Sequence, residues 1–308
     1  MTDIVGKRFR FFLASGIVIL FCIISLASFG LKYGIELSSG SLLTVNFEQT
    51  VNEAELKQEL ANLGYGGAII QRTGEGAFLI RTSELTGEDK TELEEGLTAR
   101  FGPATESQFY SVSPMVASET ARNAGIAIGV AAVGILLYVT WAFRKMPKPF
   151  RYGTCAIIAL GHDALVALGV FAVLGGTLGW EINLMFITGI LAVVGYSVNN
   201  TVVVFDRIRE NLIRGISADF ETVVNTSLVE TLSRSLNTSL TTLFVVLALL
   251  LFVGTSIQNF AVVLLVGIVA GTFSSICIAP NLLIVWEKGE WGRLFRRLSP
   301  SRAKAKGA

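Results

Sequence analysis

The sequence is poor in the residues that carry most enzymatic and metal chemistry. Its 308 residues include a single histidine, His162, and only three cysteines. Cys22, Cys155 and Cys277 all lie inside long apolar stretches, where a thiol behaves as a small buried side chain. A zinc site, a disulfide framework and a Ser-His catalytic arrangement therefore lack their raw material. We expect no enzyme activity, no metal and no cofactor.

Charge is also scarce, and the apolar residues are gathered into blocks. Charged residues make up 16% of the chain and hydrophobic residues 52%, whereas a soluble domain is about 25% charged. A helix needs roughly 20 apolar residues to cross a bilayer. Six stretches are long enough, which predicts a polytopic α-helical membrane protein with six transmembrane helices: Phe11–Leu31, Asn123–Phe143, Thr154–Leu178, Ile182–Phe205, Leu236–Gly254 and Phe260–Trp286.

The basic residues predict the orientation of these helices. Of the 25 lysines and arginines, 18 lie before the first stretch, between the second and third, after the fourth and after the sixth. The positive-inside rule then places both termini in the cytoplasm, as a multi-pass protein of the bacterial cytoplasmic membrane. The remaining seven lie in residues 32–122 beside 14 acidic residues, a net charge of −7. We expect this segment to be extracytoplasmic, and a segment that acidic is not expected to bind nucleic acid.

The predicted organisation follows from these boundaries. Residues 1–10 form a cytoplasmic N-terminus, 11–31 the first transmembrane helix, 32–122 an extracytoplasmic α+β domain, 123–286 helices two to six, and 287–308 a basic cytoplasmic tail. The first apolar run is longer than that of a usual signal peptide, although Ser25-Leu26-Ala27 loosely resembles a cleavage site. We expect an uncleaved anchor there.

Between the first two apolar stretches the hydrophobic period changes. Leu43, Val45 and Phe47 alternate as in a strand, while Leu56, Leu60 and Leu63 are spaced as in a helix. Two short strand-like runs, 68–72 and 77–81, flank the hairpin signal 73–76, and a second helical pattern and a last strand follow up to residue 112. The order β-α-β-β-α-β is that of the ferredoxin-like motif. The segment contains no catalytic constellation, so we expect a contact domain.

Several polar residues stand inside the apolar stretches, where an ionised side chain costs about 2.5–3.5 kcal/mol, so each is a functional candidate. Asp163 is the one carboxylate well inside a stretch, next to His162. The alternative is a hydrogen bond that only holds the helices together. The fourth stretch carries Tyr196, Ser197, Asn199, Asn200 and Thr201.

A polar stripe precedes and enters the fifth stretch. It consists of Ser227, Thr231, Arg234, Thr238 and Thr241 and predicts a polar seam between helices. Because Arg234 keeps its proton, it needs an acceptor or water, and we hypothesise that it pairs with Asp163. Two small-xxx-small patterns, Gly125/Gly129 and Gly267/Gly271, predict close helix packing.

Five segments occur in the order in which a known family has them. Residues 195–211, Gly-Tyr-Ser-Val-Asn-Asn-Thr-Val-Val-Val-Phe-Asp-Arg-Ile-Arg-Glu-Asn, resemble the fourth-helix signature of the SecF family. The others are residues 34–41, similar to the family's GIDFTGG motif, 159–163, 231–239 and 267–280. The 195–211 segment ends in four charged residues, which would lie at the cytoplasmic interface: Asp206, Arg207, Arg209 and Glu210. Charged side chains at such an interface often only anchor a helix end in the lipid headgroups.

The resemblance implies an auxiliary subunit of the Sec translocase. Such a subunit acts with SecD and the SecYEG translocon in the bilayer, and it uses the proton-motive force to promote export of an unfolded polypeptide. In the family picture a fourth-helix carboxylate takes up the proton and a fifth-helix arginine responds. Arg234 matches that arginine, but the carboxylate position holds Asn200, and an amide does not titrate. Either SecD carries the whole relay, or Asp163 contributes, or the coupling is weakened.

Two other function classes remain as alternatives. The first is a small-molecule or lipid efflux transporter of the resistance-nodulation-division superfamily, against which the short external domain and the fourth-helix signature argue. The second is an intramembrane enzyme, for which one histidine and one deep carboxylate give little basis.

Overall fold

A computed structural model describes residues 3–72, 76–252 and 257–291. The predicted hairpin turn 73–76 and the basic tail 287–308 fall mostly outside the described residues. The chain divides into two compact units. The helical unit comprises residues 1–32, 127–181 and 185–308, and the sheet unit comprises residues 33–126 and 182–184.

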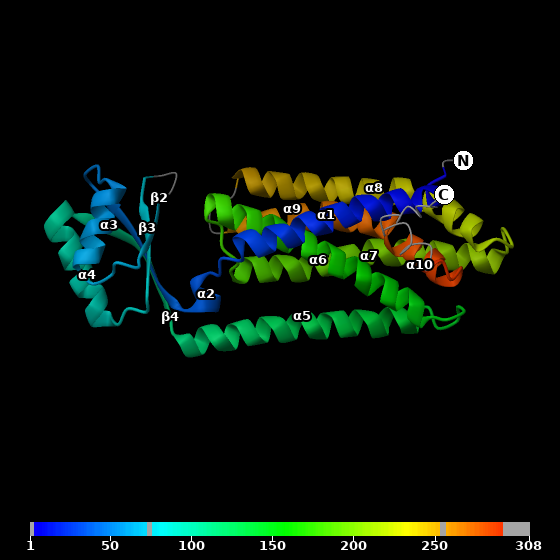
Figure 1. The fold of residues 1–308 in the computed structure, drawn as a ribbon, viewed down its shortest axis with the longest axis horizontal. Coiled ribbons are helices and arrows are strands. Elements are labelled where there is room, and N and C mark those ends of the chain that lie inside the picture. The colour runs from blue at the N-terminus through cyan, green and yellow to red at the C-terminus, as the bar shows by residue number, and fades with distance from the viewer. Residues whose placement is uncertain (1–2, 73–75, 253–256, 292–308) are drawn as a thin grey trace, which may run out of the picture. The chain divides into compact units, whose positions relative to one another are not determined.

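The structure confirms the six predicted membrane-crossing helices. Each is long and apolar enough to span a bilayer, and α1, α6, α8 and α9 run side by side (Figure 1). After a short 3-10 turn, Val5–Lys7, the helices are α1 (Arg8–Phe29), α5 (Pro114–Ala142), α6 (Phe150–Leu178), α7 (Leu184–Arg214), α8 (Phe220–Phe252), α9 (Gln258–Cys277) and α10 (Ala279–Glu287). Most extend beyond the apolar stretches because polar residues continue the helical turns outside the apolar region.

The last apolar stretch is two helices rather than one. α9 ends at Cys277 and α10 begins at Ala279, with Pro280 in the first turn of α10. Proline has no backbone N–H and its ring clashes with the preceding turn, so it is tolerated at a helix start but not in an unbroken interior. The break leaves α10 fully buried from Ala279 to Val285.

Close packing of the helices depends on small residues at the crossing points. A Cβ added to Gly267 of α9 would lie 2.1 Å from Val193 Cγ2 of α7, and one added to Gly271 would lie 2.9 Å from Ser197 Cβ. The packing prediction for this pair is confirmed. Among the described residues, nothing lies within 4 Å of such a Cβ at Gly125 or Gly129 on α5, so no close packing partner for this pair is seen there.

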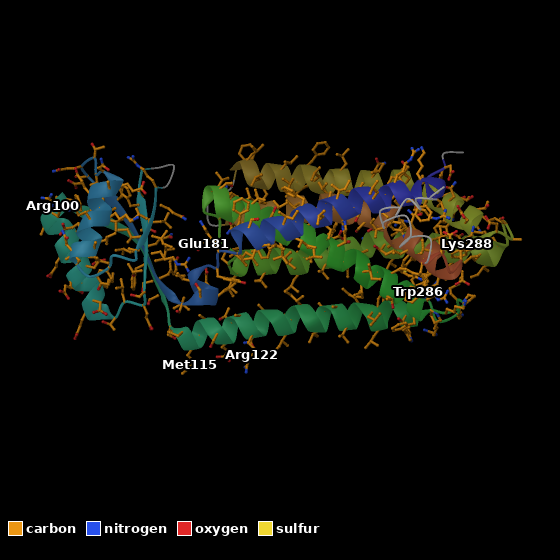
Figure 2. All side chains as sticks on the ribbon, viewed as in Figure 1. Arg100, Met115, Arg122, Glu181, Trp286 and Lys288 are labelled. Carbon is orange, nitrogen blue, oxygen red and sulfur yellow. The ribbon has the colours of Figure 1, made fainter. Side chains whose placement is uncertain are left out.

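One end of the helical unit joins segments from the start and the finish of the chain. The Arg8 guanidinium lies 2.6 Å from a Glu221 oxygen at the start of α8 and 2.9 Å from a Glu290 oxygen after α10. Lys288, labelled with Trp286 in Figure 2, also pairs with Glu221. The first and last described segments of the chain therefore share one end of the bundle.

The sheet unit has the predicted strand and helix order. After a short helix that the sequence did not predict, α2 (Ile35–Ser38), come β1 (Gly40–Phe47), α3 (Glu53–Asn62), β2 (Ile69–Arg72), β3 (Phe78–Thr82), α4 (Gly87–Phe101) and β4 (Ala104–Val112). The sheet order is β2-β3-β1-β4 with every neighbouring pair antiparallel. This is the ferredoxin-like arrangement, and the fold prediction is confirmed.

One apolar core holds the sheet unit together. Leu43 and Ile80 of the two central strands pack with Leu56, Leu60 and Leu93 of the helices, and all five are at most 1% exposed. The second helix starts at a capping box, in which the Thr86 side chain bonds the Asp89 amide and the Asp89 side chain bonds the Thr86 amide. The Thr86 hydroxyl and amide lower the pKa of the Asp89 carboxyl.

Candidate functional site: a buried polar network in the helical unit

Asp163 is the most buried carboxylate among the described residues of the helical unit, and two hydroxyl donors and a histidine ring surround it. The side chain is 1% exposed. Its Oδ2 accepts hydrogen bonds from Ser197 Oγ of α7 at 2.6 Å and from Ser274 Oγ of α9 at 2.8 Å. Its Oδ1 lies 3.0 Å from His162 Nδ1. Hydrogen bonds to a charged group contribute about 1.5–3 kcal/mol each and so offset part of the cost of burying a carboxylate.

Three helices converge on this carboxylate because each brings its buried face to the same point. On α6 the buried residues Ala159, Asp163 and Ala167 recur every four residues, and on α7 Val193 and Ser197 do the same. Gly271 of α9 keeps the space open, since its missing Cβ would lie 3.4 Å from Asp163 Oδ2. A larger residue there would separate α7 and α9 at the carboxylate.

The network continues through hydroxyl groups on α7 and α9. Thr201 Oγ1 lies 2.9 Å from Ser275 Oγ, and both hydroxyls are within 3.2 Å of the Ser197 carbonyl oxygen. Ser197 therefore joins two arms: its side chain binds Asp163, and its backbone accepts from the hydroxyl pair. Direct hydrogen bonds therefore connect α6, α7 and α9, and such a network can respond to the charge of one carboxylate.

A second group of polar side chains links α7, α8 and α9. Asn200 is buried and donates from Nδ2 to Ser239 Oγ at 3.3 Å, and Ser239 Oγ lies 2.7 Å from Thr272 Oγ1. Neither the amide nor the hydroxyls titrate in the physiological range. This group therefore has a packing and orienting role and does not bind protons.

The other two candidate residues of α7 occupy different environments. Asn199 points away from the bundle and is exposed. The hydroxyl of Tyr196 is buried and, among the residues that the structure describes, has no hydrogen-bond partner. Of the three α7 candidates, only Asn200 joins a hydrogen-bond network.

The hypothesis that Arg234 pairs with Asp163 is wrong for this chain. Asp163 is already occupied by Ser197, Ser274 and His162. Arg234 is exposed on α8, and its guanidinium makes no ion pair with any residue of the described ranges. Arg234 lies off the buried face of α8 because it directly precedes buried Ser235, and successive residues of an α-helix point about 100° apart.

The predicted polar stripe on α8 is correspondingly divided. Thr238 and Thr241 are exposed with Arg234, and their hydroxyls bond carbonyl groups of their own helix. The buried polar row of α8 is instead a four-residue repeat, made by Ser227, Thr231, Ser235 and Ser239.

The charged end of α7 pairs with itself and with α8. Arg207 lies 2.5 Å from Glu210 and 2.7 Å from Glu230 of α8, and Arg209 pairs with Asp206 at 2.5 Å. These pairs are partly exposed, so water and salt screen them and they contribute little to stability. They join the end of α7 to the first half of α8 rather than forming a chemical site.

The sequence did not identify the hydroxyl partners of Asp163. Ser197 was visible within the fourth-helix segment, three residues before Asn200 and so on the same helical face. Ser274 follows Gly271 by three residues and shares the face that the small-residue pattern marks. Both could have been found by extending each face by one turn. Among the described residues, no three His, Cys, Asp or Glu side chains gather as a metal site would need.

Comparisons with known proteins identify the family. The family described as "Protein export membrane protein SecD/SecF, C-terminal" matches residues 93–289, and a "SecD/SecF GG Motif" matches residues 24–51. A protein translocase subunit SecF of Thermobaculum terrenum is 44% identical over 98% of this chain and 99% of its own length. The SecF of Anaerolinea thermophila is 41% identical over 96% of this chain.

Solved structures of SecDF have the same fold. A crystal structure of SecDF from Thermus thermophilus, described as a translocon-associated membrane protein, matches with a TM-score of 0.82 and 32% identity over 93% of this chain. This chain spans only 39% of that SecDF chain and 38% of the Bacillus subtilis SecDF, to which it is 32% identical. The matches give no support to the efflux-transporter alternative.

Proposed function

Because this chain belongs to the SecD/SecF protein-export family and is an auxiliary subunit of the Sec protein translocase, we propose that it works with SecD to couple the proton-motive force to polypeptide export. The observation that carries the proposal is the end-to-end match to SecF subunits. In SecDF proteins the equivalent region is joined to a longer remainder. That remainder is the part that a separate SecD subunit supplies to this chain.

The proposed orientation has both termini in the cytoplasm of a bacterium and the chain spanning the cytoplasmic membrane. The clustering of 18 of 25 basic residues supports this orientation. The shared end of the first and last described segments, joined by Arg8, Glu221 and Glu290, also supports it, since an even number of crossings returns the chain to its starting side. The acidic sheet unit then lies outside, where it would contact the emerging unfolded polypeptide.

The membrane part of the subunit has two polar regions with different proposed partners. The Asp163 network lies within the bundle and is satisfied by this chain. Arg234 is exposed and without an ion-pair partner in the described ranges, and an arginine beside an apolar stretch needs an acceptor. We place that acceptor on SecD, so that Arg234 would form an ion pair between the two subunits. Tyr196, Asn199 and Asn200 lie on α7, close in sequence to Ser197 of the Asp163 network.

The α5 helix offers a surface for the same partner. Within this chain it is almost entirely exposed, and the side chains of Met115 and Arg122 project freely from it (Figure 2). A helix with so little contact in its own chain buries its apolar side against lipid or against another subunit. A SecD surface at α5, and contact of the assembly with SecYEG, belong to this proposal.

Complementation tests the proposal. A bacterium depleted of its own SecF accumulates precursors of exported proteins, and expression of this chain with its cognate SecD is expected to relieve that accumulation in a pulse-chase assay. A tag on the chain is expected to recover SecD and SecYEG from solubilised membranes. The chain expressed without its SecD is the matched control. Normal membrane insertion with neither SecD recovery nor relief of precursor accumulation would contradict the proposal.

A further inference from the structure

We propose that the proton-binding site of this subunit is the His162–Asp163 pair on α6. The inference rests on the proposed coupling to the proton-motive force, and it names the group within this chain that changes charge. On α7, the position at which the SecF family has a carboxylate holds Asn200, whose amide donates to Ser239 and does not titrate. Among the described residues, the histidine and the carboxylate that lie deep in the bundle are His162 and Asp163.

Among the described residues around Asp163, the one group that could carry a positive charge is His162, when it is protonated. From α7 the carboxylate faces the hydroxyl of Ser197, from α9 the hydroxyl of Ser274, and from its own helix the imidazole of His162. None of these carries a fixed charge. Among the described residues, the carboxylate is therefore held by hydrogen bonds alone, with no fixed cation beside it.

His162 has the geometry of a relay between this carboxylate and the outside of the network. With Nδ1 at 3.0 Å from Asp163 Oδ1, the ring donates its Nδ1 hydrogen to the ionised carboxylate. Nε2 is then an acceptor, and within the described residues this buried atom has no partner. The His162 side chain is 9% exposed, and it also lines a groove of about 510 Å³ between α1, α6 and α9, beside Val18 and Phe273.

The proton transfer balances without a further reactant. A proton binds to Nε2, and the Nδ1 hydrogen moves to Asp163 Oδ1. The imidazole is neutral again, with its hydrogen now on Nε2, and the carboxylate has become a carboxylic acid. The reverse sequence releases the proton, so the net change is one positive charge gained or lost inside the bundle.

Ser274 converts that charge change into a change between helices. Its hydroxyl has two acceptors within reach, Asp163 Oδ2 at 2.8 Å and the Gly271 carbonyl of its own helix at 3.2 Å. An ionised Asp163 is the stronger acceptor and holds α9 to α6. Once Asp163 is protonated, Ser274 can turn to Gly271 and stay satisfied, so the bond between the two helices is lost at little cost.

Infrared difference spectroscopy of the full chain with its SecD partner in lipid nanodiscs tests the pair directly. On lowering the pH, we expect a carbonyl band of a newly protonated carboxylic acid in an apolar environment. Asp163→Asn is expected to lose that band. Glu48→Gln, the same chemical change at an exposed residue of the sheet unit, is the matched control and is expected to keep it.

Two further variants separate the roles within the pair. In His162→Gln, the glutamine amide can still donate to Asp163 but lacks the imidazole nitrogen that would accept a proton. The band is therefore expected to persist with a shifted pH midpoint and slower hydrogen exchange. Ser274→Ala removes one donor and is expected to shift the band's frequency and midpoint, which keeps the test valid if Asp163→Asn does not fold. A band that is unchanged in folded Asp163→Asn, or that is unmoved by both other variants, overturns the inference. If the wild-type chain still supports export, the proposed function would stand without this proton site. If the wild-type chain does not support export, the proposed function itself would be contradicted.

Discussion

Substituting alanine at Gly267 and Gly271 of α9 tests whether the approach of α7 and α9 positions the polar network. At Gly267 the added Cβ would lie 2.1, 2.5 and 2.9 Å from the three outer carbon atoms of Val193. Contacts under 3.0 Å require a neighbour to move, and a β-branched valine on a helix has one favoured rotamer. At Gly271 the added Cβ would lie 2.9 Å from Ser197 Cβ and 3.0 Å from Ser197 Oγ, so the hydroxyl that binds Asp163 must shift.

The magnitudes follow from two opposing effects. Overpacking a well-packed site costs about 1–3 kcal/mol, and replacing glycine by alanine in a helix returns up to about 1 kcal/mol. Gly267→Ala, with three close contacts to a stiff side chain, is expected to destabilise the helical unit by about 2 kcal/mol net. Gly271→Ala is expected to cost about 1 kcal/mol, because its closest contacts, at 2.9 and 3.0 Å to Ser197, are less severe than those at Gly267.

Unfolding of the purified chain in mixed lipid and denaturing detergent, followed by tryptophan fluorescence, measures these differences. Gly195→Ala on α7 is the control, since nothing lies within 4 Å of a Cβ at that position. It is expected to be neutral or slightly stabilising. Equal stabilities for Gly267→Ala and Gly195→Ala would refute the argument that close contact of α7 with α9 holds the network in place.

Three further predictions concern single residues. Arg234→Leu is expected to change the chain's own stability by no more than about 0.5 kcal/mol, because the residue is exposed, yet to abolish export support. Arg234→Lys is expected to be intermediate at best, since lysine lacks the planar guanidinium. Wild-type export by Arg234→Leu at normal expression would remove Arg234 from the mechanism. Asn200→Asp is expected to lower the yield of folded protein without strengthening the pH dependence of export, because Ser239 offers no charge to balance a carboxylate there; a steeper pH dependence in vesicles would show the opposite. Ser39 has φ 65° and ψ 168°, a backbone conformation that only glycine adopts freely. Ser39→Gly is therefore expected to stabilise the fragment of residues 34–112 by about 1 kcal/mol, measured by urea denaturation of the fragment expressed alone. A lower urea midpoint for the variant would contradict this.

Much of the architecture could be predicted because each signal was local. Apolar length alone located the six crossing helices, and the alternation of Leu43, Val45 and Phe47 gave the register of a central strand with its core side correct. The break before Ala279 could have been placed from Pro280, but the apolar run on both sides masked it. The short helix α2 leaves no such signal, because four residues span barely one turn.

The candidate site was less accessible because its contacts join distant segments. Asp163 could be singled out as a lone buried charge, but its donors on α7 and α9 are 34 and 111 residues away in sequence. Arg234 looked like its partner by charge balance alone. The structure gives the carboxylate neutral partners instead, since the α8 face that packs inward carries serines while the arginine lies on the outer face. Tertiary packing decides which of these two faces of α8 turns inward, and the sequence of one helix does not show it.

The central claim is that this subunit uses the proton-motive force for export through Asp163. The most direct measurement follows translocation of a precursor into inverted membrane vesicles that contain SecYEG, SecD and this chain, with and without an imposed proton gradient. With the wild-type chain, the gradient is expected to speed completion of translocation, and Asp163→Asn, at equal incorporation, is expected to remove that gain while leaving gradient-independent translocation intact. An equal response to the gradient in the wild type and in Asp163→Asn would contradict the account.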